Sequence, residues 1–166
     1  MMKTILLLRH AKSSWDDASV LDHDRPLKPR GIKAAGQIGQ LLAQKKLIPE
    51  LILCSTAVRA RQTLRLVLES AGCQPPVEFT ERLYHCPPSD FRRVVKQVDS
   101  TVKSLMIVGH NPGLEDFLNE LTGTVQTMPT AALARIQLNL SDWSSFAEDT
   151  RGDLVNVWKP REFDKK

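Results

Sequence analysis

Short runs of consecutive apolar residues alternate along the chain with longer stretches in which apolar residues recur every three or four positions. A short apolar run is typical of a strand buried on both faces, and the longer period is typical of an amphipathic helix. The pattern predicts strands over residues 4–8, 51–54, 77–79, 105–108, 132–140 and 154–158. It predicts helices over residues 30–47, 57–71, 89–98 and 114–121. This alternation predicts an α/β protein, a three-layer αβα sandwich with a mostly parallel central sheet.

Residues that favour turns and caps mark the ends of several predicted elements. Pro49 ends the first helix, and Gly72 is expected to cap the second helix at its carboxyl end. Ser89 is expected to be the N-cap of the third helix. The strand at 77–79 follows two prolines, and we expect it at an edge of the sheet.

The chain shows no internal repeat, no low-complexity linker and no internal boundary. Its 166 residues are enough to bury about two-thirds of the surface of the unfolded chain, so one core is feasible without disulfides or a metal. We therefore expect a single domain over residues 1–160 with a polar tail at 161–166, and a monomer.

The charge of the chain does not favour a nucleic-acid partner. The formal net charge is +4, and basic residues are mixed with acidic ones rather than gathered in blocks with interleaved aromatics. A solvated surface with a mild attraction for anions is the simpler interpretation.

The cysteines and the apolar runs indicate the cellular compartment in which the protein is expected. Three cysteines without a paired C-x-x-C spacing argue against a disulfide framework and a zinc site, and they fit a reducing compartment. The apolar run Ile5–Leu8 is too short for a membrane span or a signal-peptide core. We expect a cytoplasmic protein with no membrane partner, no metal and no cofactor.

Basic or titratable residues follow three of the predicted buried strands. The first strand runs into Arg9 and His10, and the second runs into a helix that carries Arg59 in its first turn. The strand at 105–108 runs into His110. Because ligands bind at the carboxyl ends of strands in such sheets, we expect these four side chains to form one site.

Two arginines and two histidines at one edge of a sheet suit a compact dianion. Each guanidinium can donate to two phosphate oxygens, and free N–H groups at helix starts add to the attraction. Of these side chains, the histidines are the ones suited to proton transfer or nucleophilic attack near pH 7. Asp22 and Asp24 are the nearest acids that could orient the histidines. Single basic residues have simpler explanations; His23, for example, is more simply a surface histidine, and Arg61 a solvated arginine. The presence of several such groups at the same end of the strands is what indicates a site.

Three motifs, in this order, resemble those of the histidine phosphatase superfamily, which includes the phosphoglycerate mutases. They are LLLRHAKSSW, STAVRARQT and VGHNPG. The short chain and the segment HDRPLKPRG make it most similar to the SixA-type phosphohistidine phosphatases. The resemblance extends from about residue 3 to residue 158 and implies a phosphoglycerate mutase-like fold.

The resemblance also implies roles for particular residues. His10 would be the nucleophile, and His110 would complete the pocket. For this division of roles, His10 must be unprotonated while His110 keeps its proton. Arg9 and Arg59 would bind the phosphoryl group. Further candidate substrate contacts are Arg25 and Asn111.

The sequence departs from the family pattern at three positions. Ala11 replaces the usual glycine, and Thr56 stands where proline is common. Asp16 falls where mutases usually carry asparagine, and its negative charge argues against a mutase more than against a phosphatase.

The substrate class can be argued from the leaving group. Larger members of the superfamily supply a carboxylate as a general acid from an insertion after the second motif, and the matching region here, 78–89, is short. Glu81 is its clearest candidate, although a surface acid is the simpler interpretation. An imidazole, with a pKa of about 6.5, leaves easily once protonated. This favours a metal-independent protein phosphohistidine phosphatase, with a broad small-molecule phosphomonoesterase or a non-catalytic phosphate-binding module as alternatives.

A competing signature is present at residues 85–92, which match the His-Cys-x5-Arg pattern of cysteine-based tyrosine phosphatases. That loop must wrap phosphate with consecutive backbone N–H groups, and Pro87 and Pro88 have none. Asp90 would add a negative charge to the phosphate cradle. We therefore disfavour Cys86 as a nucleophile.

Overall fold

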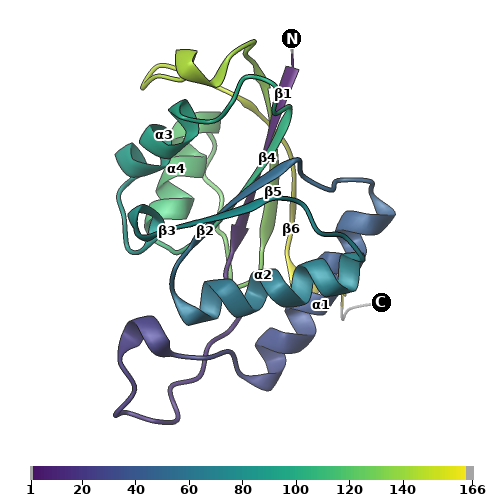
Figure 1. Ribbon diagram of the computed structural model, residues 1–166, viewed down its shortest axis with the longest axis vertical. Coiled ribbons are helices and arrows are strands. Elements are labelled where there is room, and N and C mark those ends of the chain that lie inside the picture. Colours follow the sequence, from purple (N-terminus) through teal and green to yellow (C-terminus); the bar gives the residue numbers. More distant parts are fainter. Residues whose placement is uncertain (1, 164–166) are drawn as a thin grey trace.

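A six-stranded sheet forms the middle layer of the protein in the computed structural model, which describes residues 2–163 (Figure 1). Its strands are β1 (Met2–Arg9), β2 (Leu51–Ser55), β3 (Val77–Thr80), β4 (Ser104–Gly109), β5 (Leu133–Asn139) and β6 (Asp153–Trp158). The order across the sheet is β3-β2-β4-β1-β5-β6. Strands β1 to β4 run parallel, and β5 runs antiparallel to both of its neighbours. The predicted mostly parallel sheet, with β3 at an edge, is confirmed.

Helices cover both faces of this sheet. The α-helices are α1 (Pro29–Gln44), α2 (Val58–Ala71), α3 (Pro88–Lys96), α4 (Gly113–Thr122) and α5 (Pro160–Phe163). Three short 3-10 helices are η1 (Asp22–Asp24), η2 (Glu81–Leu83) and η3 (Trp143–Ser145). Helices α1 and α2 lie on one face, and α3 and α4 lie on the other (Figure 1). The predicted three-layer sandwich is therefore confirmed.

Strand β1 shows why its sequence is apolar throughout. Leu7 packs with Phe117 in the core beneath α3 and α4, and Leu8 packs with Ile38 in the core beneath α1 and α2. All four side chains are fully buried. Because neighbouring residues of a strand point to opposite faces, a strand covered on both sides must be apolar at every position. The two cores fix β1, and with it the position of the residues that follow.

One of the helix caps predicted from the sequence is present in the structure, and another is not. Gly72 caps α2 in the left-handed conformation at φ 70°, as expected. The prediction that Ser89 is an N-cap is wrong, because Pro87 is the N-cap and the helix begins at Pro88. Proline suits the first helical position, since its fixed φ is helical and the N–H that it lacks would have no helical partner there.

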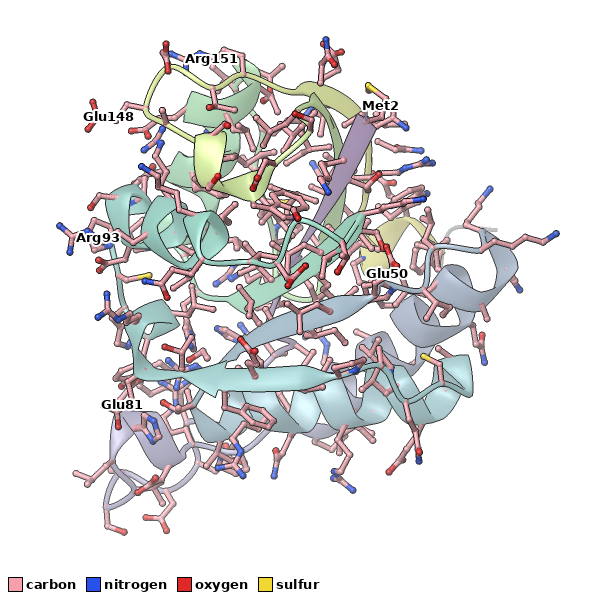
Figure 2. The ribbon with its side chains drawn as sticks, turned by 45° about the horizontal axis from the view of Figure 1, so that its top comes forward. Met2, Glu50, Glu81, Arg93, Glu148 and Arg151 are labelled. Atoms are coloured by element: carbon pink, nitrogen blue, oxygen red, sulfur yellow. The ribbon has the colours of Figure 1, made fainter. Side chains whose placement is uncertain are left out.

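The parallel strands direct their carboxyl ends to one edge of the sheet. Figure 2 shows Met2, at the amino end of β1, far from Glu81, which follows the carboxyl end of β3. At the end of the described chain, Phe163 of α5 packs against the core beneath α1 and α2. Residues 164–166 of the expected tail lie outside the described residues. Between residues 2 and 163, no helix is long and apolar enough to cross a membrane.

Gly113 allows the start of α4 to approach the backbone of Cys86. A Cβ atom at this position would collide with the carbonyl group of Cys86, which as a main-chain group cannot rotate away. We expect Gly113→Ala to lower the free energy of unfolding by about 1–3 kcal/mol, as overpacking does elsewhere. Urea unfolding measures this change.

Gly36 offers the matched control, because a Cβ atom there would meet nothing within 4 Å. Since glycine is unfavourable inside a helix, Gly36→Ala should raise the free energy of unfolding by roughly 0.5–1 kcal/mol. Equal stabilities for the two alanine variants would contradict the close approach at Gly113.

Candidate active site

Two histidines meet where β1 and β4 end. The strands pair in parallel with Arg9 opposite Gly109, and the His10 N–H donates to the Gly109 carbonyl at 3.1 Å. The next residue after β4 is His110, and its ring centroid lies 5.0 Å from that of His10. Adjacent parallel strands thus bring together two rings that are 100 residues apart in the sequence.

The His10 ring is held in one tautomer. Its Nδ1 lies 2.7 Å from the carbonyl oxygen of Ala11, and because a carbonyl oxygen only accepts, Nδ1 carries the proton. The lone pair of the neutral ring is therefore on Nε2. Burial lowers the pKa of His10 to about 3; the bond to Ala11 opposes this effect, and nearby guanidinium groups add to it. An uncharged ring with its lone pair on Nε2 is what nucleophilic attack requires.

The His110 ring is buried and uncharged as well. Its Nε2 lies 2.7 Å from the Ser55 hydroxyl at the end of β2, and its buried Nδ1 has no hydrogen-bond partner among the described residues. Burial, together with the neighbouring His10 and Arg59, lowers the pKa of His110 far below its usual value. Burial and the surrounding cations thus disfavour a charged ring, so the expected protonated form of His110 requires a further negative charge beside it.

Two arginines bring positive charge to the same edge. Arg59, in the first turn of α2, is 3% exposed, and its Nη1 and Nη2 donate to the carbonyl oxygen and carboxylate of Asp22 at 2.6 and 3.1 Å. Arg9 ends β1 and donates from Nη1 to the Met128 carbonyl at 3.0 Å. The buried Nε of Arg9 has no partner among the described residues. Both guanidinium groups thus retain N–H donors for an anion.

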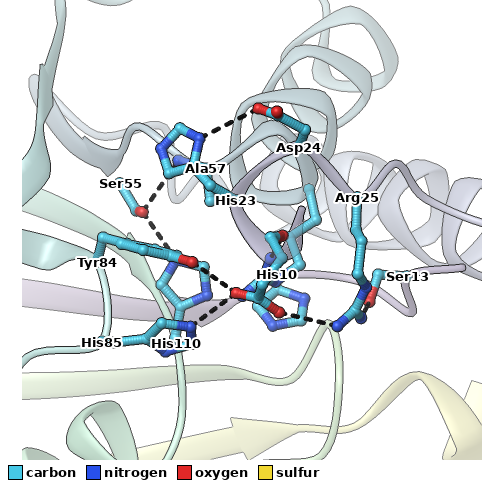
Figure 3. Close-up of polar contacts among 12 residues, drawn as sticks. His10, Ser13, His23, Asp24, Arg25, Ser55, Ala57, Tyr84, His85 and His110 are labelled. Atoms are coloured by element: carbon cyan, nitrogen blue, oxygen red, sulfur yellow. Dashed lines mark hydrogen bonds and ion pairs between the residues drawn. The ribbon is translucent and has the colours of Figure 1, made fainter. Parts of the chain in front are cut away.

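The Asp22 carboxylate, in η1, gathers four side chains. It accepts hydrogen bonds from Arg25 Nη1 at 2.9 Å, Arg59 Nη2 at 3.1 Å, Tyr84 Oη at 2.6 Å and His85 Nε2 at 2.8 Å. Dashed lines in Figure 3 mark the bonds from Arg25, Tyr84 and His85. Burial by itself raises the pKa of Asp22, but the bonds from Tyr84 and His85 and the charge of Arg59 outweigh it and lower the pKa well below the usual range. The carboxylate therefore stays ionised and holds these groups together.

The two candidate orienting acids have different partners. Asp22 contacts His85 rather than His10 or His110. Asp24 lies 3.5 Å from Nδ1 of His23, whose Nε2 lies 3.0 Å from the Thr56 hydroxyl. The orienting contact to His10 comes instead from the Ala11 carbonyl.

Tyr84 and His85 are site residues that the sequence analysis missed. Their ring centroids lie 4.2 Å apart, and those of His85 and His110 lie 5.3 Å apart. Both residues follow η2, which itself follows the carboxyl end of β3. The rule that ligands bind beyond strand ends applies to this parallel edge strand too, and applying it to β3 would have reached them.

The two further candidate substrate contacts have structural partners. Arg25 is buried, donates to the Ser14 carbonyl at 3.1 Å, and lies with its guanidinium carbon 3.1 Å from the centroid of the Trp15 ring. The Asn111 amide donates to Glu115 at 3.1 Å and to the Met128 carbonyl at 3.0 Å. The Asn111 side chain thereby links the first turn of α4 to the segment that follows this helix.

The three departures from the family pattern are accommodated. Ala11 is fully buried, its φ is not positive, and its N–H donates to the Thr63 hydroxyl at 2.9 Å. Asp16 is exposed to solvent. The Thr56 hydroxyl contacts His23, as described above.

Cys86 does not have the properties of a nucleophile. Burial, and secondarily the charge of Asp90, raises the pKa of its thiol to about 11. The reactive form of cysteine is the thiolate, which this environment disfavours. In addition, Pro88 begins α3, so the segment cannot supply the run of backbone donors that a cysteine phosphatase uses.

Comparisons with known proteins agree with this geometry. Residues 5–92 match the histidine phosphatase superfamily (branch 1). An uncharacterized protein of Mycobacterium tuberculosis is 41% identical over 165 residues, which span 93% of this chain and 100% of the relative. An uncharacterized chloroplastic protein of Arabidopsis thaliana is 32% identical over 150 residues, which span 85% of this chain and 69% of the relative.

Solved structures extend the comparison to the whole fold. A candidate phosphohistidine phosphatase SixA from Nakamurella multipartitia superposes with a TM-score of 0.84 and 26% identity over 96% of this chain and 97% of the other. A candidate SixA from Agrobacterium tumefaciens gives a TM-score of 0.81 and 28% identity over 95% and 98%. The chain belongs to the histidine phosphatase superfamily, and within it the structure is SixA-like, with the phosphoglycerate mutase-like fold. Its family and neighbours support a phosphatase activity.

The buried, uncharged histidines make the stability of the fold depend on pH. Histidine in an unfolded chain has a pKa of about 6.5, and folding lowers the pKa of both His10 and His110. Below about pH 6.5 the unfolded state takes up protons that the folded state does not. The free energy of unfolding should therefore fall as the pH drops from 7 to 5, by up to about 1.4 kcal/mol per pH unit for each ring.

Urea unfolding at pH 7 and pH 5 measures this slope, and His10→Asn supplies the comparison. Because one of the two rings is removed, the decrease in the free energy of unfolding from pH 7 to pH 5 should be smaller by up to half. A slope unchanged in His10→Asn would show that the ring is not held uncharged by the fold.

Proposed function

We propose that the protein is a metal-independent phosphatase that transfers the phosphoryl group of its substrate to His10, and that the substrate is phosphohistidine in a protein. The observation that carries this proposal is the buried, uncharged His10 ring, with its lone pair on Nε2, beside His110 and two arginines. Among the described residues, no group of three or more His, Cys, Asp or Glu is arranged to hold a metal ion.

The proposed reaction has two displacements at phosphorus. His10 Nε2 attacks in line, a P–N bond forms, and the bond to the leaving group breaks. Water then attacks the phosphohistidine, phosphate is released, and the electron pair returns to Nε2. The transition states spread negative charge over the equatorial oxygens, so the rate depends mainly on positioned positive charge.

The arginines and His110 are the groups that can supply this charge. Arg59 uses two of its five N–H donors on Asp22, which leaves three for phosphoryl oxygens. Arg9 contributes a second guanidinium. A phosphoryl dianion beside His110 would favour the protonated ring, because an opposite charge within a few ångströms raises the pKa of an imidazole. We therefore assign a protonated His110 to the complex with substrate.

The leaving group supports phosphohistidine as the substrate. The Asp22 carboxylate stays ionised and has no proton to donate. An alkoxide leaving group needs a strong proton donor such as a neutral carboxylic acid, whereas an imidazole accepts a proton near neutral pH and leaves readily with the help of a weaker donor. The similarity to candidate SixA phosphohistidine phosphatases supports the same substrate class.

Replacing His10 tests the covalent step. We expect His10→Ala to abolish turnover and to prevent trapping of labelled phosphate on the protein, because the substitution removes the Nε2 lone pair that attacks phosphorus. Cys86→Ser is the control and should trap and turn over phosphate like the wild type. Trapping in His10→Ala, or its loss in Cys86→Ser, would contradict the assignment of the nucleophile.

The same assay, run side by side on a phosphohistidine peptide, p-nitrophenyl phosphate and a sugar phosphate, tests the substrate class. We expect the highest kcat/KM on the phosphohistidine peptide. A strong preference for the sugar phosphate would favour a small-molecule phosphomonoesterase and leave the nucleophile unaffected. No trapping and no turnover with any of the three would favour a phosphate-binding module.

Arg59 and Arg61 form a matched pair on α2. Arg59 is buried against Asp22, whereas Arg61 is exposed, with its guanidinium carbon 5.1 Å from the centroid of the Phe79 ring. Arg59→Ala should lower kcat/KM by a factor equivalent to the loss of about 2–4 kcal/mol of transition-state stabilisation, which is the cost of losing one oxyanion donor. Arg61→Ala should leave kcat/KM within about twofold. Similar losses in the two variants would contradict the special role of Arg59.

A further inference from the structure

Two buried histidine rings and one exposed histidine ring lie in succession at the site. His10 and His110 are 7% and 4% exposed, and the side chain of His85 is 49% exposed. The successive ring centroids lie 5.0 and 5.3 Å apart (Figure 3). In an in-line displacement the leaving group departs on the side opposite the nucleophile. If His10 attacks from the buried side, the leaving group departs on the solvent side, where His85 lies.

We propose that His85 is a catalytic residue that donates a proton to the leaving group and then accepts one from the attacking water. This inference rests on the proposed function, since it takes His10 as the nucleophile.

His85 is held in place by its neighbours on two sides. Its Nε2 lies 2.8 Å from Asp22 Oδ2, and its ring centroid lies 4.2 Å from that of Tyr84. The backbone of His85 has φ 48°, in the left-handed region that residues other than glycine seldom adopt. The next residue, Cys86, is held by the close approach of Gly113. These contacts fix an exposed histidine at the edge of the site.

The charges around His85 suit a proton donor. The Asp22 carboxylate faces its Nε2 at 2.8 Å. Arg25 and Arg59 form ion pairs with the same carboxylate. The rings of Tyr84 and His110 lie next to the His85 ring. Because Nε2 is bonded to Asp22, Nδ1 is the nitrogen that can exchange a proton with the leaving group.

Other groups near the edge are less suited to this role. Glu81 is exposed at the outer margin of the molecule (Figure 2). Both nitrogens of the His23 ring have partners, at 3.5 Å in Asp24 and 3.0 Å in Thr56. Asp22 is ionised and binds four donors. Among these groups, His85 alone combines exposure, a fixed position and contact with the His110 ring.

The proton balance closes over one turnover. As His10 Nε2 bonds to phosphorus, the bond from phosphorus to the leaving group breaks, and the proton on His85 Nδ1 moves to the departing atom. Neutral His85 then takes a proton from the water that attacks the phosphohistidine. Phosphate leaves, the electron pair of the P–N bond returns to His10, and His85 is protonated again.

The test compares two aryl phosphates that differ only in the leaving group. p-Nitrophenolate leaves without much help, whereas the phenolate of phenyl phosphate is a stronger base and needs a proton donor. We expect His85→Asn to lower kcat/KM on phenyl phosphate by on the order of 100-fold or more, the usual contribution of general acid catalysis. The loss on p-nitrophenyl phosphate should be less than about tenfold. Asparagine is chosen because it tolerates the left-handed backbone at this position.

His23→Asn is the matched control, since His23 lies near Tyr84 but has partners on both nitrogens. It should change kcat/KM on both esters by the same small factor. His85→Gln repeats the test with a longer amide, in case the asparagine variant unfolds.

Equal losses on the two esters, or no loss on either, would overturn the role of His85. In that case labelled phosphate would still be trapped on His10, and the proposed function would stand. Failure to trap phosphate in the wild type would instead remove the proposed function itself, so the two outcomes are distinguishable.

Discussion

The hydrogen bond from His10 Nδ1 to the Ala11 carbonyl is the interaction on which the site depends. It fixes the tautomer and therefore places the lone pair on Nε2. Burial and the nearby guanidinium groups keep the ring uncharged. A histidine with its proton on the other nitrogen, or with a positive charge, could not attack phosphorus from this position. The strand pairing of β1 with β4 then places His110 beside the same ring.

Asp22 organises the outer part of the site. Its carboxylate joins Arg59, from α2, to Tyr84 and His85, from the segment after η2. A carboxylate near a phosphate site would ordinarily weaken anion binding by repulsion. Here its charge is shared between Arg25 and Arg59, and Arg59 retains donors for another anion. The same carboxylate holds an exposed histidine beside a buried one, so Asp22 links phosphate binding to proton transfer in this proposal.

The sequence predicted the central sheet and the inner part of the site because both follow from local patterns. Strands buried on both faces are mainly apolar; Arg9 ends such a strand, and His10 and His110 directly follow such strands. The contacts of Asp22 with Tyr84 and His85 span 62 and 63 residues between irregular segments. The strand-end rule could have pointed to Tyr84 and His85, but no periodicity marks their contacts with Asp22, so these contacts could not be predicted. The burial that lowers the pKa of His110 likewise depends on tertiary packing and not on residue type.

A crystal structure of the protein with vanadate would test the central claim most directly, because vanadate adopts the geometry of the displacement at phosphorus. We expect vanadium within bonding distance of His10 Nε2, with oxygens in contact with Arg59 and His110. Vanadate bound to Cys86, or bound away from the His10 ring, would contradict it.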